Sequence, residues 1–119
     1  MYKLLHSRDG TILNEYELKE GSYVIGRRPD CDIRIDDSTV SGIHAEIKVE
    51  PSEFMEGTFQ VSIEDKGSTN GTSVNNRSIK KHLLKHDEVV RIGLHDLKLV
   101  DSNSGAFETT RFVLPEDDG

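Results

Sequence analysis

The chain has few cysteines and no long apolar run, which disulfide-rich, metal-cluster and membrane-spanning proteins require. It has no tryptophan, one cysteine and three prolines among 119 residues. A single cysteine, Cys31, excludes an internal disulfide and a cysteine metal cluster, so we expect a small core residue there. No apolar run approaches the roughly 18 residues of a membrane span, and no apolar stretch of secretory length opens the chain. These absences favour the cytoplasm, without a membrane partner.

Positive charge is also scarce. Fifteen Lys and Arg stand against 22 Asp and Glu, which gives a formal net charge of −7 and a sequence pI near 5.2. Such a field repels nucleic-acid phosphates, so no nucleic-acid partner is expected. Basic residues nevertheless gather at Arg27, Arg28 and Arg34. A small cationic site for a compact anion is therefore compatible with the acidic chain.

Short β-rich runs recur at intervals of roughly eight to twelve residues, with turn residues between them. The predicted strands are Tyr2–Leu5, Glu17–Leu18, Ser22–Ile25, Ile33–Ile35, Ala45–Val49, Phe59–Asp65, Thr72–Val74, Arg77–Ile79, Glu88–Ile92 and Leu97–Asp101. Apolar and charged residues alternate within Ala45–Val49, as in a strand with one buried face. Asn75-Asn76 suits a tight hairpin turn with positive φ angles. The pattern predicts an all-β fold of two packed antiparallel sheets, with no helix and with a turn or bend at Lys80–Asp87.

The length predicts one domain, which we assign to residues 1–101. Residues 102–119 are expected to form a flexible acidic tail, because they open on Ser102-Asn103-Ser104-Gly105 and end in Glu116-Asp117-Asp118-Gly119. An extra strand near the end of the chain is the alternative, since Phe112, Val113 and Leu114 can pack on a sheet.

Three polar elements lie between the predicted strands. They are Gly26-Arg27, Ser41-Gly42-Ile43-His44 and Asp65-Lys66-Gly67-Ser68-Thr69-Asn70-Gly71-Thr72. An arginine held at a strand end can offer its planar donor fork to a phosphate, and loop hydroxyls and amides can add further donors. The amide of Asn70 suits pairing with the backbone of an extended peptide. Together the elements predict a binding protein.

Each element also has a plainer interpretation. Arg27 can be a surface arginine paired with Asp30 or Asp32, and Asn70 can be an ordinary turn residue before a glycine. A hydrolase that uses Ser41 or Ser68 with His44 is another alternative, but the sequence shows no strong candidate for a third catalytic member and no nucleophile elbow. A histidine at the start of a buried strand more often braces a loop through its ring nitrogens. The hydrolase is accordingly the weakest of the alternatives.

Nothing in the sequence points to a cofactor or a metal. The loop Gly67–Thr72 lacks the Gly-Lys-Ser/Thr ending of a Walker phosphate loop, and no Gly-x-Gly-x-x-Gly occurs. His82 and His86 have the spacing of a metal pair on a helix, but their segment lacks helical periodicity and a third ligand. We therefore expect no catalytic residues, no cofactor and no metal.

The three elements in this order resemble the forkhead-associated (FHA) domain, whose pattern is Gly-Arg, Ser-x-x-His, and Ser/Thr-x-Asn-Gly-Thr followed by a further Asn. The resemblance covers roughly Leu4 to Val100, because the flanking strand pattern recurs in Cys31-Asp32-Ile33 and Val89–Gly93. It implies an SMAD/FHA-like β-sandwich of about eleven strands, whose end loops bind phosphothreonine peptides. It also implies a protein that is not an enzyme.

The resemblance assigns roles to individual residues. The implied phosphopeptide-binding residues are Arg27, Ser41, Gly42, Thr69, Asn70 and, as a weaker candidate, Asn75. The implied structural supports of the site are Gly26, His44, Gly67 and Gly71. One position departs from the pattern, because Gly42 stands where the family often has Arg, Lys or Asn to add a phosphate contact. Arg28 or Lys66 is left to compensate.

The resemblance further implies a partner. It is a protein that carries phosphothreonine, produced by a Ser/Thr kinase, or the chain's own tail after phosphorylation at Thr109 or Thr110. A phosphate-independent adaptor on the same sandwich is the alternative. The sequence names neither the partner nor the kinase, and it fixes neither the flanking residue preference nor the oligomeric state.

Overall fold

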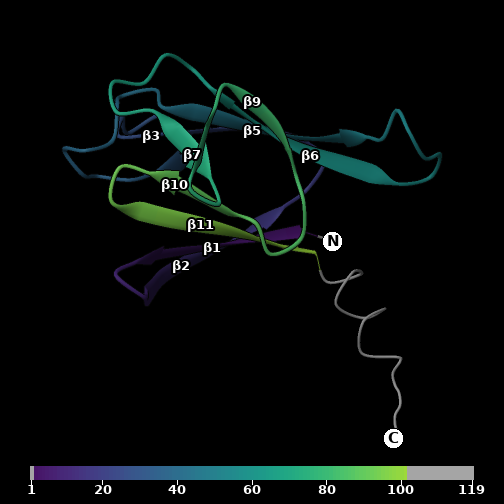
Figure 1. Ribbon diagram of the computed structural model, residues 1–119, viewed down its shortest axis with the longest axis horizontal. Coiled ribbons are helices and arrows are strands. Elements are labelled where there is room, and N and C mark those ends of the chain that lie inside the picture. The colour runs from purple at the N-terminus through teal and green to yellow at the C-terminus, as the bar shows by residue number, and fades with distance from the viewer. Residues whose placement is uncertain (1, 102–119) are drawn as a thin grey trace, which may run out of the picture.

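A computed structural model describes residues 2–101 of the chain, which form eleven strands and, within that range, no helix (Figure 1). The strands are β1 (Tyr2–Arg8), β2 (Thr11–Leu18), β3 (Gly21–Gly26), β4 (Ile33–Arg34), β5 (Ala45–Pro51), β6 (Phe59–Asp65), β7 (Thr72–Val74), β8 (Arg77–Ile79), β9 (Lys81–Leu84), β10 (Val89–Ile92) and β11 (His95–Asp101). No helix among the described residues is long and apolar enough to cross a membrane. The predicted tail, with Thr109 and Thr110, lies outside the described residues.

The strands form two sheets stacked as a sandwich (Figure 1). The six-stranded sheet has the order β2-β1-β11-β10-β7-β8, and the five-stranded sheet has the order β4-β3-β5-β6-β9. β1 and β11 pair along nearly their whole length, from Tyr2 opposite Asp101 to Ser7 opposite Asp96. The two ends of the described sandwich therefore lie side by side. The all-β sandwich predicted from the sequence is confirmed.

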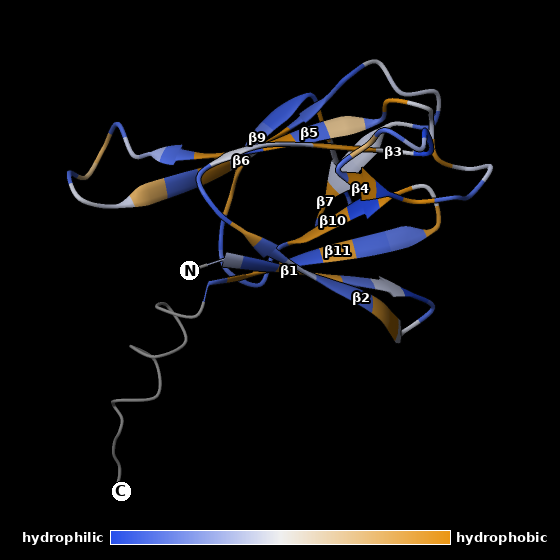
Figure 2. Ribbon diagram, turned by 180° about the vertical axis from the view of Figure 1, so that it is seen from behind, coloured by the Kyte–Doolittle hydropathy of each residue, from blue (hydrophilic) through white to orange (hydrophobic). Residues whose placement is uncertain are grey.

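Alternating side chains build the core. In β5, Ala45, Ile47 and Val49 are buried, whereas the charged residues between them face solvent. Figure 2 shows apolar segments running along strands of both sheets, mixed with hydrophilic positions. The core residues that lose all or nearly all contact with solvent include Leu4, Ile25, Ile47, Ile63, Val90, Ile92, Leu97 and Leu99. Period-two patterning thus produces the two facing apolar layers, whose burial stabilises the fold.

The hairpin turn predicted at Asn75-Asn76 is confirmed. It joins β7 to β8, and both residues have positive φ, 48° at Asn75 and 70° at Asn76. Asparagine tolerates this region because its short side chain can form local hydrogen bonds. The side chain of Asn75 also makes a long-range contact, since its Oδ1 accepts a hydrogen bond from the amide of Val89 in β10 at 2.9 Å.

Three secondary-structure predictions need correction. The segment Lys80–Asp87 contains the edge strand β9 instead of only a turn, and β2 begins at Thr11, well before the predicted Glu17. Both strands show little alternation because they lie at sheet edges, where few side chains are buried. β4 pairs with β3 in parallel, so the five-stranded sheet is not wholly antiparallel.

The backbone beyond β3 passes very close to the loop that precedes β5. The amide of Arg27 donates to the carbonyl of Ser41 at 2.9 Å, and that of Arg28 donates to the carbonyl of Gly42 at 3.2 Å. A Cβ atom added to Gly26 would lie 2.1 Å from the Gly42 carbonyl oxygen. Only glycine fits at this crossing, which fixes where the two loops meet.

A buried polar network links the six-stranded sheet to the same loop. His6 Nε2 lies 2.8 Å from His95 Nδ1, and His95 Nε2 lies 2.9 Å from a carboxylate oxygen of Asp37, which Arg8 also approaches at 3.5 Å. Because a carboxylate only accepts, His95 Nε2 donates to Asp37, and in the neutral pair His6 Nε2 donates to His95. His6 Nδ1 is then buried without a partner among residues 2–101. Tyr16 stacks on the His6 ring and completes its surroundings.

We predict that Gly26→Ala destabilises the protein strongly. The added methyl group would overlap the Gly42 carbonyl, so both loops must move, at a cost of about 3 kcal/mol or more in the free energy of unfolding. Urea denaturation followed by circular dichroism measures this loss. Ser22→Ala, at an exposed position of the same strand, is the matched control and is expected to change stability by about 0.5 kcal/mol at most. Equal stability of the two variants would contradict the close approach.

We also predict that stability falls as the pH drops through about 6.5. Burial lowers the pKa of His6 from its usual 6.5, and the adjacent His95 lowers that pKa further. The unfolded chain therefore binds this proton more readily, so the contribution of His6 is present above pH 6.5 and is lost below it. Urea denaturation at about pH 7.5 and pH 5.5 measures the change. His6→Gln should flatten the dependence and His82→Gln should keep it; the same slope in both would contradict the assignment.

Candidate functional site

Three loops at one end of the sandwich bring the polar elements of the sequence together. Arg27 follows β3, Ser41 lies in the loop before β5, and Thr69 and Asn70 lie in the loop before β7. The amide of Thr69 donates to Ser41 Oγ at 3.0 Å, so the second and third loops touch at the serine hydroxyl. Since the oxygen accepts this bond, the hydroxyl hydrogen of Ser41 can donate elsewhere.

Arg27 is exposed and held only through its backbone. Its amide donates to Ser41, and its carbonyl accepts a hydrogen bond from Arg34 Nε at 3.0 Å. Its guanidinium group makes no ion pair or hydrogen bond with the described residues. The alternative pairing with Asp30 or Asp32 does not occur, because Asp30 pairs with Arg28 and Asp32 accepts from the amide of Val24.

Gly42 lies beneath the side chain of Arg28. A Cβ atom added to Gly42 would be 3.3 Å from Arg28 Cγ and 3.5 Å from Arg28 Cδ. The carbonyl of Gly42 accepts the amide of Arg28 and also the thiol of Cys31, whose Sγ lies 3.3 Å away. The prediction that Cys31 is a core residue is wrong, because it is half-buried under these loops and lies outside the core cluster. Burial raises the pKa of the thiol, which keeps it protonated as a donor.

The loop before β7 is organised by Asp65, the last residue of β6. Its carboxylate accepts hydrogen bonds from the amides of Gly67 and Ser68 and from the hydroxyls of Ser68 and Thr72. Burial alone raises the pKa of Asp65, but these donors together outweigh burial and leave that pKa below its usual value. Gly67 and Gly71 both have a φ of +83°, the left-handed conformation that the two ends of the loop require.

His44 links the loop before β5 to the loop before β7 from within the core. It is fully buried, its Nδ1 accepts the amide of Ser41 at 3.0 Å, and its Nε2 lies 2.9 Å from the carbonyl oxygen of Gly71. A carbonyl only accepts, so Nε2 carries the hydrogen and the ring is a neutral tautomer. Both ring nitrogens are therefore engaged with backbone groups, and neither contacts the hydroxyl of Ser41.

Asn70 is positioned by a residue that the sequence does not single out. Its Nδ2 donates to the carbonyl of Thr39 at 2.9 Å, while Asp37 in turn accepts the amide and hydroxyl of Thr39. These donors and His95 hold the pKa of Asp37 well below its usual range. The signal in the sequence is Asp37-x-Thr39 in a polar loop, the pattern of a side chain that caps its own turn. Asn70 Oδ1 makes no hydrogen bond with the described residues.

Asn75 stands apart from the other predicted contacts. Its amide donates to the carbonyl of Val89 and its side chain accepts from the same residue, so it fastens the β7–β8 turn to β10. The next residue, Asn76, lines a shallow hollow of about 360 Å³ together with Asn70, Ser78 and Arg91. The structure thus brings Arg27, Ser41, Thr69 and Asn70 together and leaves Asn75 in a supporting turn.

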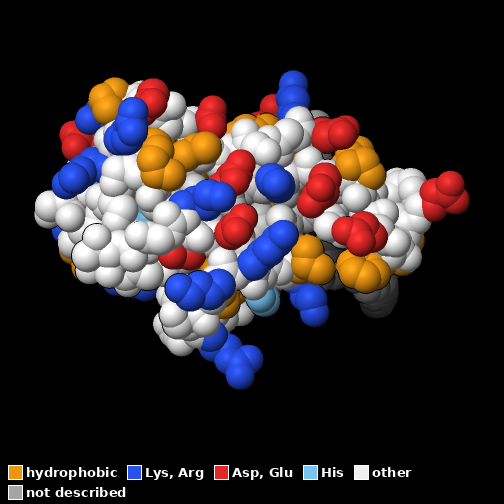
Figure 3. All heavy atoms as spheres, turned by 90° about the horizontal axis from the view of Figure 1, so that it is seen from above, with side chains coloured by type: hydrophobic (Ala, Val, Ile, Leu, Met, Phe, Trp, Pro, Cys, Tyr) orange, Lys and Arg blue, Asp and Glu red, His pale blue; other side chains and the backbone are white. Residues whose placement is uncertain are grey.

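The remaining basic and histidine candidates are engaged elsewhere. Lys66 Nζ lies 3.6 Å from Glu46 and 3.7 Å from Glu64, on the outer face of β5 and β6, where Figure 3 shows charges of both signs intermixed. His82 hydrogen-bonds Glu88, and His86 Nδ1 accepts the amide of Asp101. Within residues 2–101, no group of three potential metal ligands gathers.

Comparisons with known proteins agree with this geometry. The family model described as the FHA domain matches residues 23–93. The glycogen accumulation regulator GarA of Mycobacterium tuberculosis (strain H37Rv) is 43% identical over 68 residues, which are 57% of this chain and 38% of that protein. FhaA of the same strain, named an FHA domain-containing protein, is 38% identical over 78 residues, or 66% of this chain and 14% of that protein. The chain thus spans well under two thirds of the length of either relative.

A solved structure extends the likeness to the whole sandwich. Described as a structural and functional analysis of phosphothreonine-dependent FHA domain interactions, it is 33% identical to this chain, with a TM-score of 0.70. The match covers 84% of this chain and 95% of the solved one. Because the family model spans more than half of the 119 residues and the three loop elements fall in their expected places, this chain belongs to the FHA-domain family.

Proposed function

We propose that this domain binds a phosphothreonine-bearing segment of a partner protein through the loops that carry Arg27, Ser41, Thr69 and Asn70. The observation that carries the proposal is the unpaired guanidinium of Arg27. Its neighbours Arg28 and Arg34 both contact carboxylates, at 3.1 Å and 3.8 Å, while Arg27 contacts none among the described residues. An exposed cation beside a cluster of hydroxyl and amide donors suits a phosphate, which brings about −1.5 to −2 charges and three acceptor oxygens.

Ser41 supplies the first hydroxyl of the proposed site. Its oxygen accepts the amide of Thr69, which leaves its hydrogen free to donate, and a phosphate oxygen is the acceptor we assign. The backbone bond from Arg27 to Ser41 holds the guanidinium and the hydroxyl on adjoining segments. Preorganised donors of this kind bind an anion without first losing conformational freedom.

Asn70 would hold the peptide backbone next to the phosphothreonine. The bond from its Nδ2 to Thr39 fixes the plane of the amide, and its exposed Oδ1 is left to accept a peptide N–H group. Thr69, which is also exposed, would border the niche for the threonine methyl group. A site built in this way would recognise both the phosphate and the backbone of the peptide that carries it.

The same geometry supports a binding module over an enzyme. A serine hydrolase needs a histidine within hydrogen-bond reach of the nucleophilic hydroxyl. His44 instead uses Nδ1 for the amide of Ser41 and Nε2 for the carbonyl of Gly71. The role we assign is phosphorylation-dependent protein–protein interaction in signalling, in the cytoplasm and downstream of a Ser/Thr kinase. The names of its relatives, which include a regulator, are compatible with such a role.

The chain's own tail is a second source of the same ligand. Thr109 and Thr110 lie eight and nine residues beyond Asp101, the last residue of β11, so a phosphate on either would place a phosphothreonine on a short tether. Tethering raises the effective concentration of a ligand to the millimolar range when the linker can span the distance. Binding to the tail of the same chain or of a second copy is therefore part of the proposal.

We predict that Arg27→Ala and Ser41→Ala each weaken binding to a phosphothreonine peptide by about tenfold or more. Each removes a hydrogen bond to a charged group, which contributes about 1.5–3 kcal/mol, or at least a factor of ten. A peptide array with a fixed central phosphothreonine finds the best sequence, and fluorescence anisotropy then measures the dissociation constants. The same peptide with unmodified threonine should bind poorly.

Lys48→Ala is the matched control, since it removes one positive charge from the outer face of β5, away from the loops. It should leave the dissociation constant unchanged, and circular dichroism should show all three variants folded. Unchanged titration curves for Arg27→Ala and Ser41→Ala would rule out the site. Equal binding of the modified and unmodified peptides would instead favour the phosphate-independent adaptor.

A further inference from the structure

A second arginine, Arg28, packs against Gly42, the residue that follows Ser41. The amide of Arg28 donates to the Gly42 carbonyl at 3.2 Å, directly after the bond between Arg27 and Ser41. Its side-chain carbons lie over the open face of Gly42, within 3.3 Å and 3.5 Å of where a Cβ would be. The absence of a side chain at Gly42 therefore gives the stem of Arg28 a defined place beside the serine loop.

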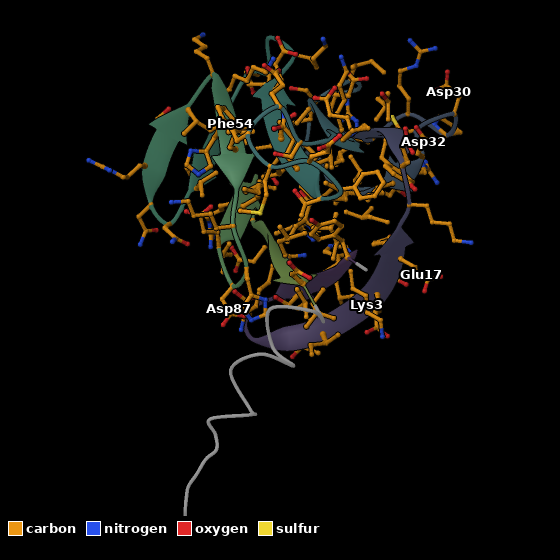
Figure 4. All side chains as sticks on the ribbon, turned by 90° about the vertical axis from the view of Figure 1, so that its right-hand side faces the viewer. Lys3, Glu17, Asp30, Asp32, Phe54 and Asp87 are labelled. Atoms are coloured by element: carbon orange, nitrogen blue, oxygen red, sulfur yellow. The ribbon has the colours of Figure 1, made fainter. Side chains whose placement is uncertain are left out.

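The present partner of the Arg28 guanidinium is Asp30. Nε lies 3.1 Å from one carboxylate oxygen, and Nη2 lies 3.2 Å from the other. The side chains are 59% and 67% exposed, and ion pairs this open to water contribute little to stability. Figure 4 shows Asp30 at the periphery of the molecule, on the loop between β3 and β4. Three of the five N–H donors of the guanidinium remain for another acceptor.

The other cations near these loops are less available. Lys66 is shared between Glu46 and Glu64 on the face of β5 and β6. Arg34 uses Nε to hold the carbonyl of Arg27, and its Nη2 lies 3.8 Å from Asp36. Arg28 has one exposed carboxylate as its charged partner, and its guanidinium holds no backbone carbonyl among the described residues, so it can change partner at a lower cost than Lys66 or Arg34.

We propose that Arg28 is a second phosphate-binding residue, which exchanges Asp30 for the phosphate of the bound peptide and supplies the side-chain donor that Gly42 lacks. This inference rests on the proposed function and deepens it. Arg27 contributes one positive charge, whereas a phosphate near neutral pH carries up to two negative charges. A dianion with three acceptor oxygens competes well against a single exposed carboxylate for a planar donor fork.

On this proposal, Arg28 strengthens binding of the phosphopeptide and Asp30 weakens it. The test is anisotropy titration of the folded chain with the best phosphothreonine peptide from the array. Arg28→Ala should weaken binding by about three- to tenfold, and Arg28→Lys should recover part of the loss, because charge remains and the fork does not. Asp30→Asn should tighten binding by about two- to fivefold, since it removes the negative charge that competes with the phosphate for Arg28. A purely structural pair would shift both variants the same way.

Matched controls separate this effect from net charge. Lys3 and Glu15 form an exposed ion pair at 3.5 Å on the six-stranded sheet, and Figure 4 shows Lys3 well below Asp30. Lys3→Ala changes the charge by the same amount as Arg28→Ala, and Glu15→Gln by the same amount as Asp30→Asn. Both controls should leave the dissociation constant within about twofold of the unmodified chain.

A side chain restored at position 42 tests the shared space. In the unsubstituted protein, Gly42→Asn should add little, because its Cβ would lie 3.3 Å from Arg28 Cγ, so the side chain of Arg28 already occupies the space beside it. In the Arg28→Ala background the same substitution should recover binding severalfold, since the space is vacant and the amide supplies a donor. Such non-additivity identifies two groups that serve one function.

The outcomes distinguish the two proposals. If the protein without substitutions binds the phosphorylated and unphosphorylated peptides equally, the proposed function fails, and this inference fails with it. If phosphate-dependent binding is lost in Arg27→Ala but unchanged in Arg28→Ala, only the role of Arg28 is overturned. Parallel weakening by Arg28→Ala and Asp30→Asn would likewise overturn it.

Discussion

The site depends on one close backbone contact, the passage of Gly26 against the carbonyl of Gly42. At this crossing, two successive amides of the β3 end donate to two successive carbonyls of the serine loop. The contact sets where Arg27 stands relative to Ser41, since neither side chain bonds the other. His44 fixes the position of the serine loop through the amide of Ser41. Asp65 shapes the loop before β7, whose Thr69 amide bonds the Ser41 hydroxyl. The proposed binding groups are thus positioned by backbone packing.

Charge is divided in a consistent way around this end of the sandwich. The carboxylates with many donors are partly buried: Asp37 and Asp65 each accept several hydrogen bonds and hold loops in shape. Asp30, by contrast, is exposed and has one charged partner. If the proposals hold, an acidic chain keeps a cationic site in this way: Asp37 and Asp65 are engaged in holding the loops, and Asp30 can give up its partner to the phosphate. Net charge therefore says little about which ligand the loops accept.

Local signals carried most of the sequence prediction. Alternation in Ala45–Val49 and the turn at Asn75-Asn76 each follow from a few adjacent residues, and both were confirmed. Strand β9 was missed because only Leu84 is buried in it, so it exists through pairing with β6. The contact between Thr39 and Asn70 could not be predicted either, because the Thr39 carbonyl accepts from a side-chain amide 31 residues away. The loop residues were found by their order, but which of them touch a ligand stays a prediction.

The pairing of Tyr2 with Asp101 has a consequence for engineering. Both ends of the described sandwich leave from neighbouring positions, and Arg8, at the other end of β1, lies beside Asp37 in the loop region. Figure 1 shows the two ends away from the loops around β3 and β7. Residues 2–101 are thus suited to insertion into a surface loop of a reporter protein, because the host would be joined at one edge while the opposite edge stays open to ligand. A split fluorescent host could then convert occupancy of the loops into an optical signal.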